Sequence, residues 1–237
     1  MLQCASLSTA TGHCTMEAAM TDQNSDPTTS REMLLDAAEA LMRESGYAAV
    51  TSRRVAAQAG LKPQLVHYYF RTMDDLFLAA FHRLANDIIG RQDAVETSER
   101  PLRAMWTILT DSRYRLLISE FVALGNHRPI VRAEFIQFGD QLRQKQVRVM
   151  ARVLASHHLT DFPWSPAFAA ILLHSLARFL AAENELGVSE GHADALSVVN
   201  WYIERYDKAD DLIDTRLAAL EAENAELRRR LVERSGS

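Results

Sequence analysis

The sequence has few cysteines, no long apolar run and no excess of basic residues. Its two cysteines, Cys4 and Cys14, lie close together near the start of the 237 residues, so we expect no disulfide framework and a reducing, cytoplasmic environment. No stretch reaches the roughly eighteen consecutive apolar residues that a membrane-spanning helix needs, so no membrane partner is expected. The formal net charge of −5 argues against a polycation that coats nucleic acid, but it is compatible with a local basic surface.

Sequence signatures of catalysis and of metal binding are also missing. The chain has no Gly-rich phosphate loop, no Gly-x-Ser-x-Gly, no His-Glu-x-x-His and no Cys-x-x-Cys. His157 and His158 are adjacent, so on a helix they would point about 100° apart and could not bind one ion together. His174 has no histidine or carboxylate three or four residues later. The sequence therefore predicts neither an enzyme nor a metal or cofactor site.

The pattern of apolar residues from Thr29 onward is helical, and strand signals are absent, so we expect an all-α protein. The predicted helices cover residues 30–45, 52–59, 63–70, 73–89, 100–110, 112–124, 129–158, 165–186 and 190–233, and a break near 206–211 is compatible with the length of the last. Glycines that follow apolar-periodic runs predict left-handed helix ends at Gly46, Gly60, Gly90, Gly125 and Gly187. Gly139 falls inside a predicted helix and indicates a kink or a close packing contact.

Two consecutive short helices near the N-terminus suggest a helix-turn-helix. Residues 52–59 and 63–70 are separated by Gly60 and a tight turn, and helices of this length are not stable alone in water. Each must therefore pack on the longer helix at 30–45, which is the layout of a helix-turn-helix. Four regions are therefore expected: a disordered arm (1–27), a helix-turn-helix DNA-binding domain (28–75), a larger helical domain (76–209) and a heptad-patterned C-terminal helix (210–237).

The surface of the helix at 63–70 has the residues that a DNA contact needs. Val66 and Phe70 form its apolar stripe, whereas the opposite face carries Gln64, His67, Tyr68 and Arg71. Between Ser45 and Met73 there is no acidic residue, and the basic residues there are Arg53, Arg54, Lys62 and Arg71. Such a local basic stretch in an acidic protein suits a polyanion, while the alternative is an ordinary solvated surface.

The stretch from Thr29 to about Ala85 resembles the DNA-binding domain of TetR-type transcriptional regulators. The matching residues are Leu34-Leu35-x-Ala37-Ala38, Gly46-Tyr47, Thr51-Ser52, Val55-Ala56-x-x-Ala59-Gly60-Leu61, Tyr68-Tyr69-Phe70 and Met73-Asp74-Asp75-Leu76-Phe77. The resemblance implies an obligate homodimer that binds a palindromic double-stranded DNA operator. It carries contacts to phosphates and bases over to Ser52, Arg53, Lys62, Gln64, Leu65, His67 and Tyr68, and the basic stretch adds Arg54 and Arg71.

Two positions depart from the pattern of that family. His67 stands where a phosphate-contacting tyrosine is usual, although a histidine can also donate a hydrogen bond. Met73 stands where a lysine commonly contacts the DNA backbone at the start of the fourth helix. We therefore expect the DNA contacts to differ from the usual set of the family at these two positions.

The larger C-terminal part has many helix-spaced apolar residues, which by themselves predict a packed core. In the TetR-like fold the same helices enclose a cavity for a small inducer, and such cavities are largely apolar with a few polar groups. The candidate lining residues are Trp106, Phe121, Phe135, Phe138, His174 and Arg178.

Two apolar faces and a heptad pattern predict how two copies would associate. The helices at 165–186 and 190–206 offer an expected four-helix dimer interface made of Leu172, Leu176, Phe179, Leu196, Val199 and Ile203. Farther on, a heptad seam is formed by Ile213, Leu217, Leu220, Asn224, Leu227 and Leu231. We expect residues 211–233 to form a short parallel zipper, with a helix that folds back on its own subunit as the alternative.

Together these features predict a ligand-responsive, DNA-binding regulator. The expected form is a repressor that a small, largely apolar ligand releases from its operator, through a movement of the fourth helix. The alternative is a constitutive DNA-binding or architectural dimer that has no inducer.

Overall fold

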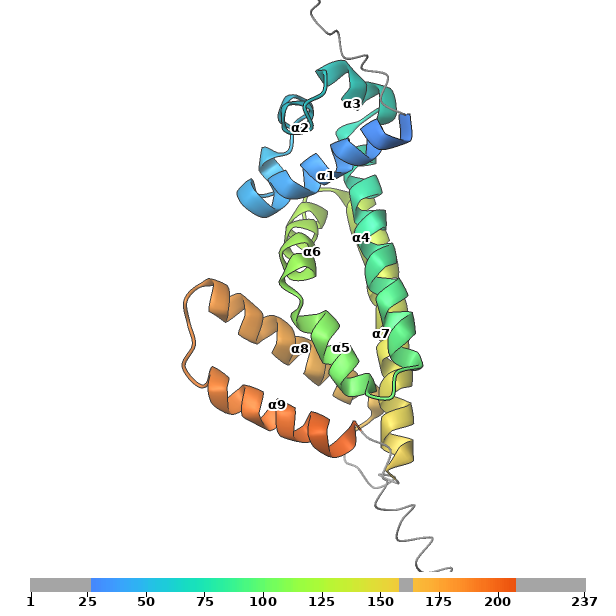
Figure 1. Ribbon diagram of the computed structural model, residues 1–237, viewed down its shortest axis with the longest axis vertical. Coiled ribbons are helices and arrows are strands. Elements are labelled where there is room, and N and C mark those ends of the chain that lie inside the picture. Colours follow the sequence, from blue (N-terminus) through green and yellow to red (C-terminus); the bar gives the residue numbers. More distant parts are fainter. Residues whose placement is uncertain (1–26, 158–163, 208–237) are drawn as a thin grey trace, which may run out of the picture.

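The computed structural model describes residues 27–157 and 164–207, and all regular elements in these ranges are helices (Figure 1). In chain order they are α1 (Pro27–Ser45), the short 3-10 helix η1 (Tyr47–Ala49), α2 (Ser52–Gln58), α3 (Pro63–Tyr69), α4 (Met73–Glu96), α5 (Pro101–Thr110), α6 (Ser112–Gly125), α7 (Pro129–Ser156), α8 (Pro166–Glu185) and α9 (His192–Tyr206). The predicted all-α class is confirmed. The expected arm before Pro27 lies outside the described residues, as do the heptad positions Leu217, Leu220, Asn224, Leu227 and Leu231.

The glycine-based predictions of helix ends are confirmed at three positions and wrong at two. Gly46, Gly60 and Gly187 have φ angles of 78°, 68° and 81°, the left-handed region that favours glycine. Gly90, however, lies inside α4, which continues to Glu96 instead of ending near residue 89. Buried residues lie on both sides of Gly90, such as Ile88 before it and Val95 after it. The packing of this continuous buried face outweighs the low helix propensity of one glycine, so the helix continues. Gly125 is the last residue of α6, and the residue that caps this helix is Asn126.

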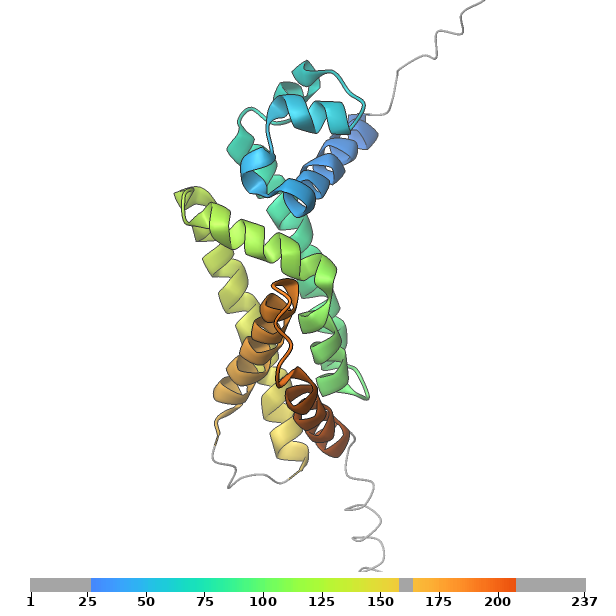
Figure 2. The same ribbon diagram turned by 90° about the vertical axis from the view of Figure 1, so that its left-hand side faces the viewer.

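The first three helices and η1 form a small unit at one end of the molecule, called the head below (Figures 1 and 2). α1 starts at Pro27, slightly earlier than expected, and supplies much of the core of the head, including Leu34 and Leu41. The two short helices are held against it by buried Val55 of α2 and Val66 of α3. The head is therefore stabilised by tertiary packing, as expected for helices of this length.

The long helices α4 and α7 run parallel from the head to the far end of the molecule (Figures 1 and 2). Ion pairs join them with a constant offset of 52 residues: His82 to Glu134, Asp93 to Lys145, and Glu96 to Arg148. This constant register fixes the two helices along their length. The head and the rest of the described chain are thereby joined by a continuous helix, α4.

Buried apolar side chains form two clusters. The first extends from α1–α3 through α4 into α6 and α7, and the second joins the far end of α4 to α5, α7, α8 and α9. Asp207 directly follows α9, and its buried carboxylate accepts hydrogen bonds from the backbone N–H groups of Leu102, at 2.5 Å, and Arg103, at 3.0 Å. The end of α9 is thus fixed to the start of α5.

The expected dimer face is only partly exposed. Val199 and Ile203 are 6% and 2% exposed within a single protomer, so they are core residues and cannot form an outer surface. The reason is that α9 is apolar on two faces, and its sequence pattern does not tell which face turns inward. Leu172, Phe179 and Leu196 are exposed, whereas Leu176 is half-buried against the second cluster.

One described helix, α8, is long and apolar enough to cross a membrane by length and composition alone. A single helix of this kind is weak evidence for a membrane span. Its exposed apolar residues have a second explanation in the contact between two copies that the sequence predicts.

Candidate DNA-binding surface and ligand cavity

The outer face of α3 is arranged as the helical period predicts. Val66 and Phe70 are buried at 1% and 3% exposure, whereas Gln64 and His67 are exposed and Tyr68 is 75% exposed. Tyr68 lies edge-to-face against Tyr69, with 4.9 Å between the ring centroids. A large exposed aromatic side chain held in one orientation is a typical contact element for a partner.

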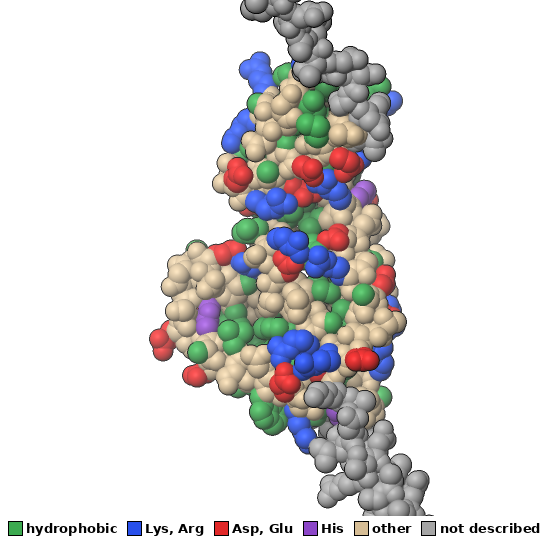
Figure 3. All heavy atoms as spheres, in the orientation of Figure 1, with side chains coloured by type: hydrophobic (Ala, Val, Ile, Leu, Met, Phe, Trp, Pro, Cys, Tyr) green, Lys and Arg blue, Asp and Glu red, His purple; other side chains and the backbone are tan. Residues whose placement is uncertain are grey.

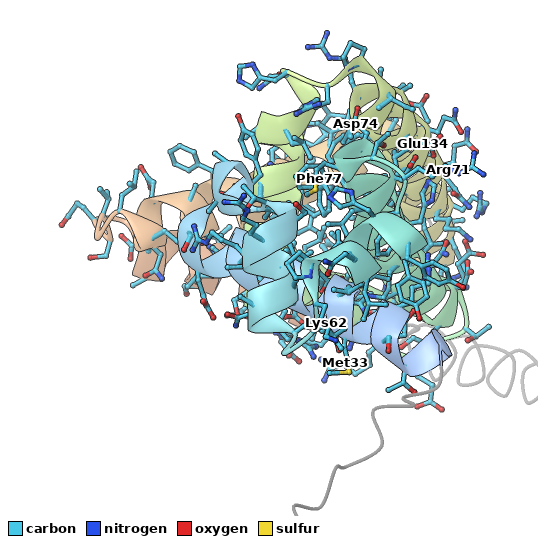
Figure 4. The ribbon with its side chains drawn as sticks, turned by 90° about the horizontal axis from the view of Figure 1, so that it is seen from above. Met33, Lys62, Arg71, Asp74, Phe77 and Glu134 are labelled. Carbon is cyan, nitrogen blue, oxygen red and sulfur yellow. The ribbon has the colours of Figure 1, made fainter. Side chains whose placement is uncertain are left out.

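The basic residues of α2 and α3 and of the segments next to α3 form no ion pair with a carboxylate in the described residues. These residues, Arg53, Arg54, Lys62 and Arg71, are all exposed. Basic side chains project from the end of the head in Figure 3, and the end-on view of Figure 4 shows Lys62 and Arg71 at separate positions on it. The head therefore carries unneutralised positive charge, which a phosphate backbone would complement.

Acidic side chains of the head are used on its other side, where it meets the rest of the molecule. Arg83 of α4 pairs with Glu32 at 3.0 Å, Asp36 at 2.8 Å and Glu39 at 2.7 Å, all on α1. Arg128 pairs with Asp74 at 3.0 Å. These pairs keep the carboxylates away from the basic surface of α2 and α3.

The starts of α2 and α4 are fixed by local caps. The Thr51 side chain accepts a hydrogen bond from the backbone N–H of Arg54, which places Ser52 in the first turn of α2, where N–H groups are free to bind an anion. Thr72 and Asp75 form a reciprocal capping box at the start of α4. Met73, at the family's lysine position, is half-buried against the head core, and Leu65 is also half-buried.

A cavity of about 300 Å³ lies between α4, α5, α6, α7 and α8. Four of the six residues predicted from the sequence line it: Phe135, Phe138, His174 and Arg178. The other two, Trp106 and Phe121, do not line it. Trp106 belongs to the second apolar cluster, and Phe121 is fully buried against Phe81, with 5.2 Å between the ring centroids, because both face the middle of the helix bundle.

The structure adds polar residues to the cavity wall that the sequence analysis missed, namely Tyr114, Arg115, Arg143 and Gln146. On amphipathic helices such residues have the same sequence pattern as a solvated face, so no sequence signal separates them from surface residues. Only the packing of α6, α7 and α8 brings them to one space.

The polar end of the cavity is built around Gln146, which is 1% exposed. Its side-chain oxygen accepts a hydrogen bond from Arg143 at 3.1 Å and lies 3.3 Å from Nδ1 of His174. Burial, with a contribution from Arg143 and Arg178, lowers the pKa of His174 to about 4, so its ring is neutral at pH 7. Burial also lowers the pKa of Arg143. On the opposite wall, the Tyr114 hydroxyl donates to Asp87, and burial together with this bond raises the pKa of Tyr114 to about 12.

The head of the chain is similar to that of known proteins. A family model described as "Bacterial regulatory proteins, tetR family" matches residues 34–80. The HTH-type transcriptional regulator BetI of Rhizobium meliloti (strain 1021) is 37% identical over 65 residues, which are 27% of this chain and 31% of that protein, so the chain matches less than a third of the length of this relative.

Solved structures share the fold over most of the chain. A putative transcriptional regulator from Saccharomonospora viridis in complex with choline has a TM-score of 0.62 at 18% identity, covering 75% of this chain and 96% of that one. A TetR transcription regulator from Haloarcula marismortui has a TM-score of 0.60 at 20% identity, covering 76% and 97%. The head of the chain is therefore similar to the DNA-binding domain of TetR-family transcriptional regulators, and the described chain as a whole shares its fold with solved regulators.

Proposed function

We propose that this protein is a cytoplasmic homodimer that binds a palindromic DNA operator and represses transcription until a small ligand releases it. The observation that carries the DNA-binding part is the outer surface of α2 and α3. Four cations that form no ion pair with a carboxylate in the described residues are exposed here, together with an exposed amide, Gln64, and an exposed ring, Tyr68, on a helix of the size that enters a major groove.

The residues of this surface divide by what they can contact. Arg53, Arg54, Lys62 and Arg71 have long cationic side chains that suit phosphates, and Ser52 adds a hydroxyl beside the free N–H groups of α2. Gln64 projects from the first turn of α3 and can pair with an adenine edge, while Leu65, His67 and Tyr68 are placed for apolar and hydrogen-bonding contacts. We therefore assign sequence preference to Gln64 and general affinity to the cations.

The cavity supports a ligand-responsive regulator over a constitutive or architectural dimer. Its volume lies at the lower end of the roughly 300–1,000 Å³ typical of small-molecule sites, and a constitutive dimer would need no such space. The related fold from Saccharomonospora viridis was solved with choline bound, which is a property of that protein. The function that we assign is regulatory and not catalytic, in line with relatives that are transcriptional regulators.

Release would require the ligand to favour one arrangement of the heads over another. α4 provides a direct connection, since its Leu76 and Phe77 belong to the same buried cluster as the core residues of the head, while Ile88, farther along the same helix, also lines the cavity. A ligand that moves α4 would change the separation of the two heads. Operator binding needs that separation to match successive major grooves, about 34 Å apart.

The test is selection of bound duplexes from a random pool, followed by measurement of affinity against salt concentration. Arg54→Ala and Lys62→Ala should weaken all duplexes alike and reduce the salt slope by about 1 each, whereas Gln64→Ala should change base preference at one position with little effect on the slope. Arg148→Ala, which removes an exposed arginine at the far end of α7, should leave both unchanged. Failure to enrich any sequence, or equal effects of Lys62→Ala and Arg148→Ala, would refute the assignment.

A further inference from the structure

The charged side chains around the cavity are all of one sign. Arg115 of α6, Arg143 of α7 and Arg178 of α8 line it, and none of its lining residues, all within the described chain, is acidic. Two carboxylates contact lining residues from outside the cavity: Glu185, in a neighbouring hollow on α8, pairs with Arg115, and Asp87 accepts a hydrogen bond from the Tyr114 hydroxyl. Arg143 and Arg178 have no carboxylate within ion-pairing distance in the described residues.

A second, independent observation is a buried side-chain N–H donor that has no hydrogen-bond acceptor in the described residues. Gln146 is 1% exposed and lines the cavity, and its side-chain N–H₂ group has no hydrogen-bond acceptor within the described residues. Its oxygen is already occupied by Arg143, at 3.1 Å. A buried amide donor without an acceptor costs free energy, and an oxygen of a bound ligand would satisfy it.

Apart from Tyr114 and Ser175, the rest of the cavity wall is mostly apolar. It is formed by Ile88, Leu109, Ile118, Phe135, Phe138 and Leu142. The neutral His174 ring lies between the two regions and adds no charge at pH 7. The cavity thus has one end that offers cations and an N–H donor and another that offers aliphatic and aromatic contacts.

We infer that the ligand of this cavity is a carboxylate with an apolar body, held by Arg143, Arg178 and the side-chain N–H₂ of Gln146. Guanidinium groups bind carboxylates through two parallel hydrogen bonds, and a partly desolvated site makes such bonds stronger. A quaternary ammonium ligand such as choline would meet positive charge without an acid to balance it. The inference rests on the proposed ligand-responsive function and specifies the chemistry of the ligand.

The test uses matched compounds with the full-length dimer: straight-chain carboxylates of six to twelve carbons and arylalkanoates, each with its own primary amide, together with choline. Binding is measured by calorimetry. We expect at least one carboxylate to bind with a Kd below about 1 mM, and each bound carboxylate to bind at least tenfold tighter than its amide. Amides or choline binding as tightly as the carboxylates, or no carboxylate binding at all, would overturn the inference.

Substitutions of the lining arginines test whether the carboxylate binds in this cavity. Arg178→Gln and Arg143→Gln should each weaken carboxylate binding about tenfold or more and leave amide binding within threefold, and Arg148→Gln, outside the cavity, should change neither. Because Arg178 lies on the exposed side of α8, Arg178→Gln keeps the test valid if Arg143→Gln fails to fold. Equal carboxylate affinity in Arg178→Gln and Arg148→Gln would place the bound anion elsewhere and overturn the inference.

DNA binding is followed separately, so that the two proposals can fail independently. If carboxylates bind but no compound changes operator affinity, the ligand-release part of the proposed function fails while the ligand chemistry stands. If a neutral or cationic compound releases the operator, the regulator stands and the carboxylate inference fails.

Discussion

At the scale of single residues, Gly139 of α7 and Gly90 of α4 can be compared directly, because each lies inside a long helix. Gly139 of α7 lines the cavity and Gly90 of α4 does not, yet a Cβ added at either would meet no atom within 4 Å. Gly139 is therefore not a close packing contact, which was one expectation from the sequence. The missing side chain at this position instead leaves space in the cavity wall.

Gly139→Leu is expected to raise stability and to block the cavity. Leucine is better than glycine in a helix interior by roughly 0.5–1 kcal/mol, and its side chain would extend into the ligand space. Gly90→Leu should give a similar gain without an effect on binding. Thermal unfolding and calorimetry with the tightest carboxylate measure the two effects; a Gly139→Leu protein that binds as well as Gly90→Leu would show that ligands bind outside this cavity.

Single residues also show which features of the structure can be predicted from the sequence and which cannot. The buried and exposed sides of α3 follow from its period, since Val66 and Phe70 can only turn inward together. The cationic end of the cavity could not be predicted, because Arg115, Arg143 and Arg178 come from three helices and meet only through long-range packing. Phe121 and Trp106 are expected in the cavity from the sequence but lie in the core, because composition alone does not separate a core aromatic residue from a lining one.

At the scale of elements, α6 is a second connection between the cavity and the head, in addition to α4. Its residues Arg115 and Ile118 line the cavity. Farther along, the Glu120 carboxylate accepts a hydrogen bond of 2.6 Å from the backbone N–H of Tyr47 in η1. The sequence indicates only the fourth helix as this link, because a hydrogen bond between residues 73 positions apart leaves no pattern in the sequence.

Glu120→Ala should loosen this contact without unfolding the head. The Tyr47 N–H would lose a charged acceptor, and hydrogen bonds to charged groups contribute about 1.5–3 kcal/mol, so amide exchange at Tyr47 should speed up at least tenfold. Glu120→Gln keeps an acceptor oxygen and should show a smaller effect. If a ligand changes operator affinity in the wild type, Glu120→Ala should reduce that change. Unaltered exchange at Tyr47 would show that α6 does not hold η1.

The starts of several helices were predicted better than the end of α4. Proline at the first turn fixed the starts of α3, α5, α7 and α8 correctly to within a residue or two, because its missing N–H is harmless only there. The end of α4 was wrong, because a glycine ends a helix only when no packed face continues beyond it, and Val95 provides such a face.

At the scale of the whole molecule, exposed apolar side chains gather on α8 and α9. They are Phe168, Ile171, Leu172, Phe179, Leu196, Val198, Trp201 and Tyr202. An isolated protomer would leave this surface in water, which is unfavourable, and a two-fold pairing of α8 and α9 would bury it. The interface that we expect therefore uses Val198, Trp201 and Tyr202 of α9 in place of the inward-facing Val199 and Ile203.

Phe179→Glu and Trp201→Glu should each weaken the dimer at least tenfold, because a carboxylate placed in an apolar interface loses its hydration without gaining a partner. The matched control is Ile136→Glu on α7, since Ile136 is 57% exposed and Phe179 and Trp201 are each 59% exposed. Sedimentation velocity over a dilution series measures the dimer, and operator affinity should fall in parallel, because a single head binds only one half-site. If all three variants sediment as the wild type does, α8 and α9 do not form the interface, and the predicted C-terminal zipper becomes the element that holds the two copies together.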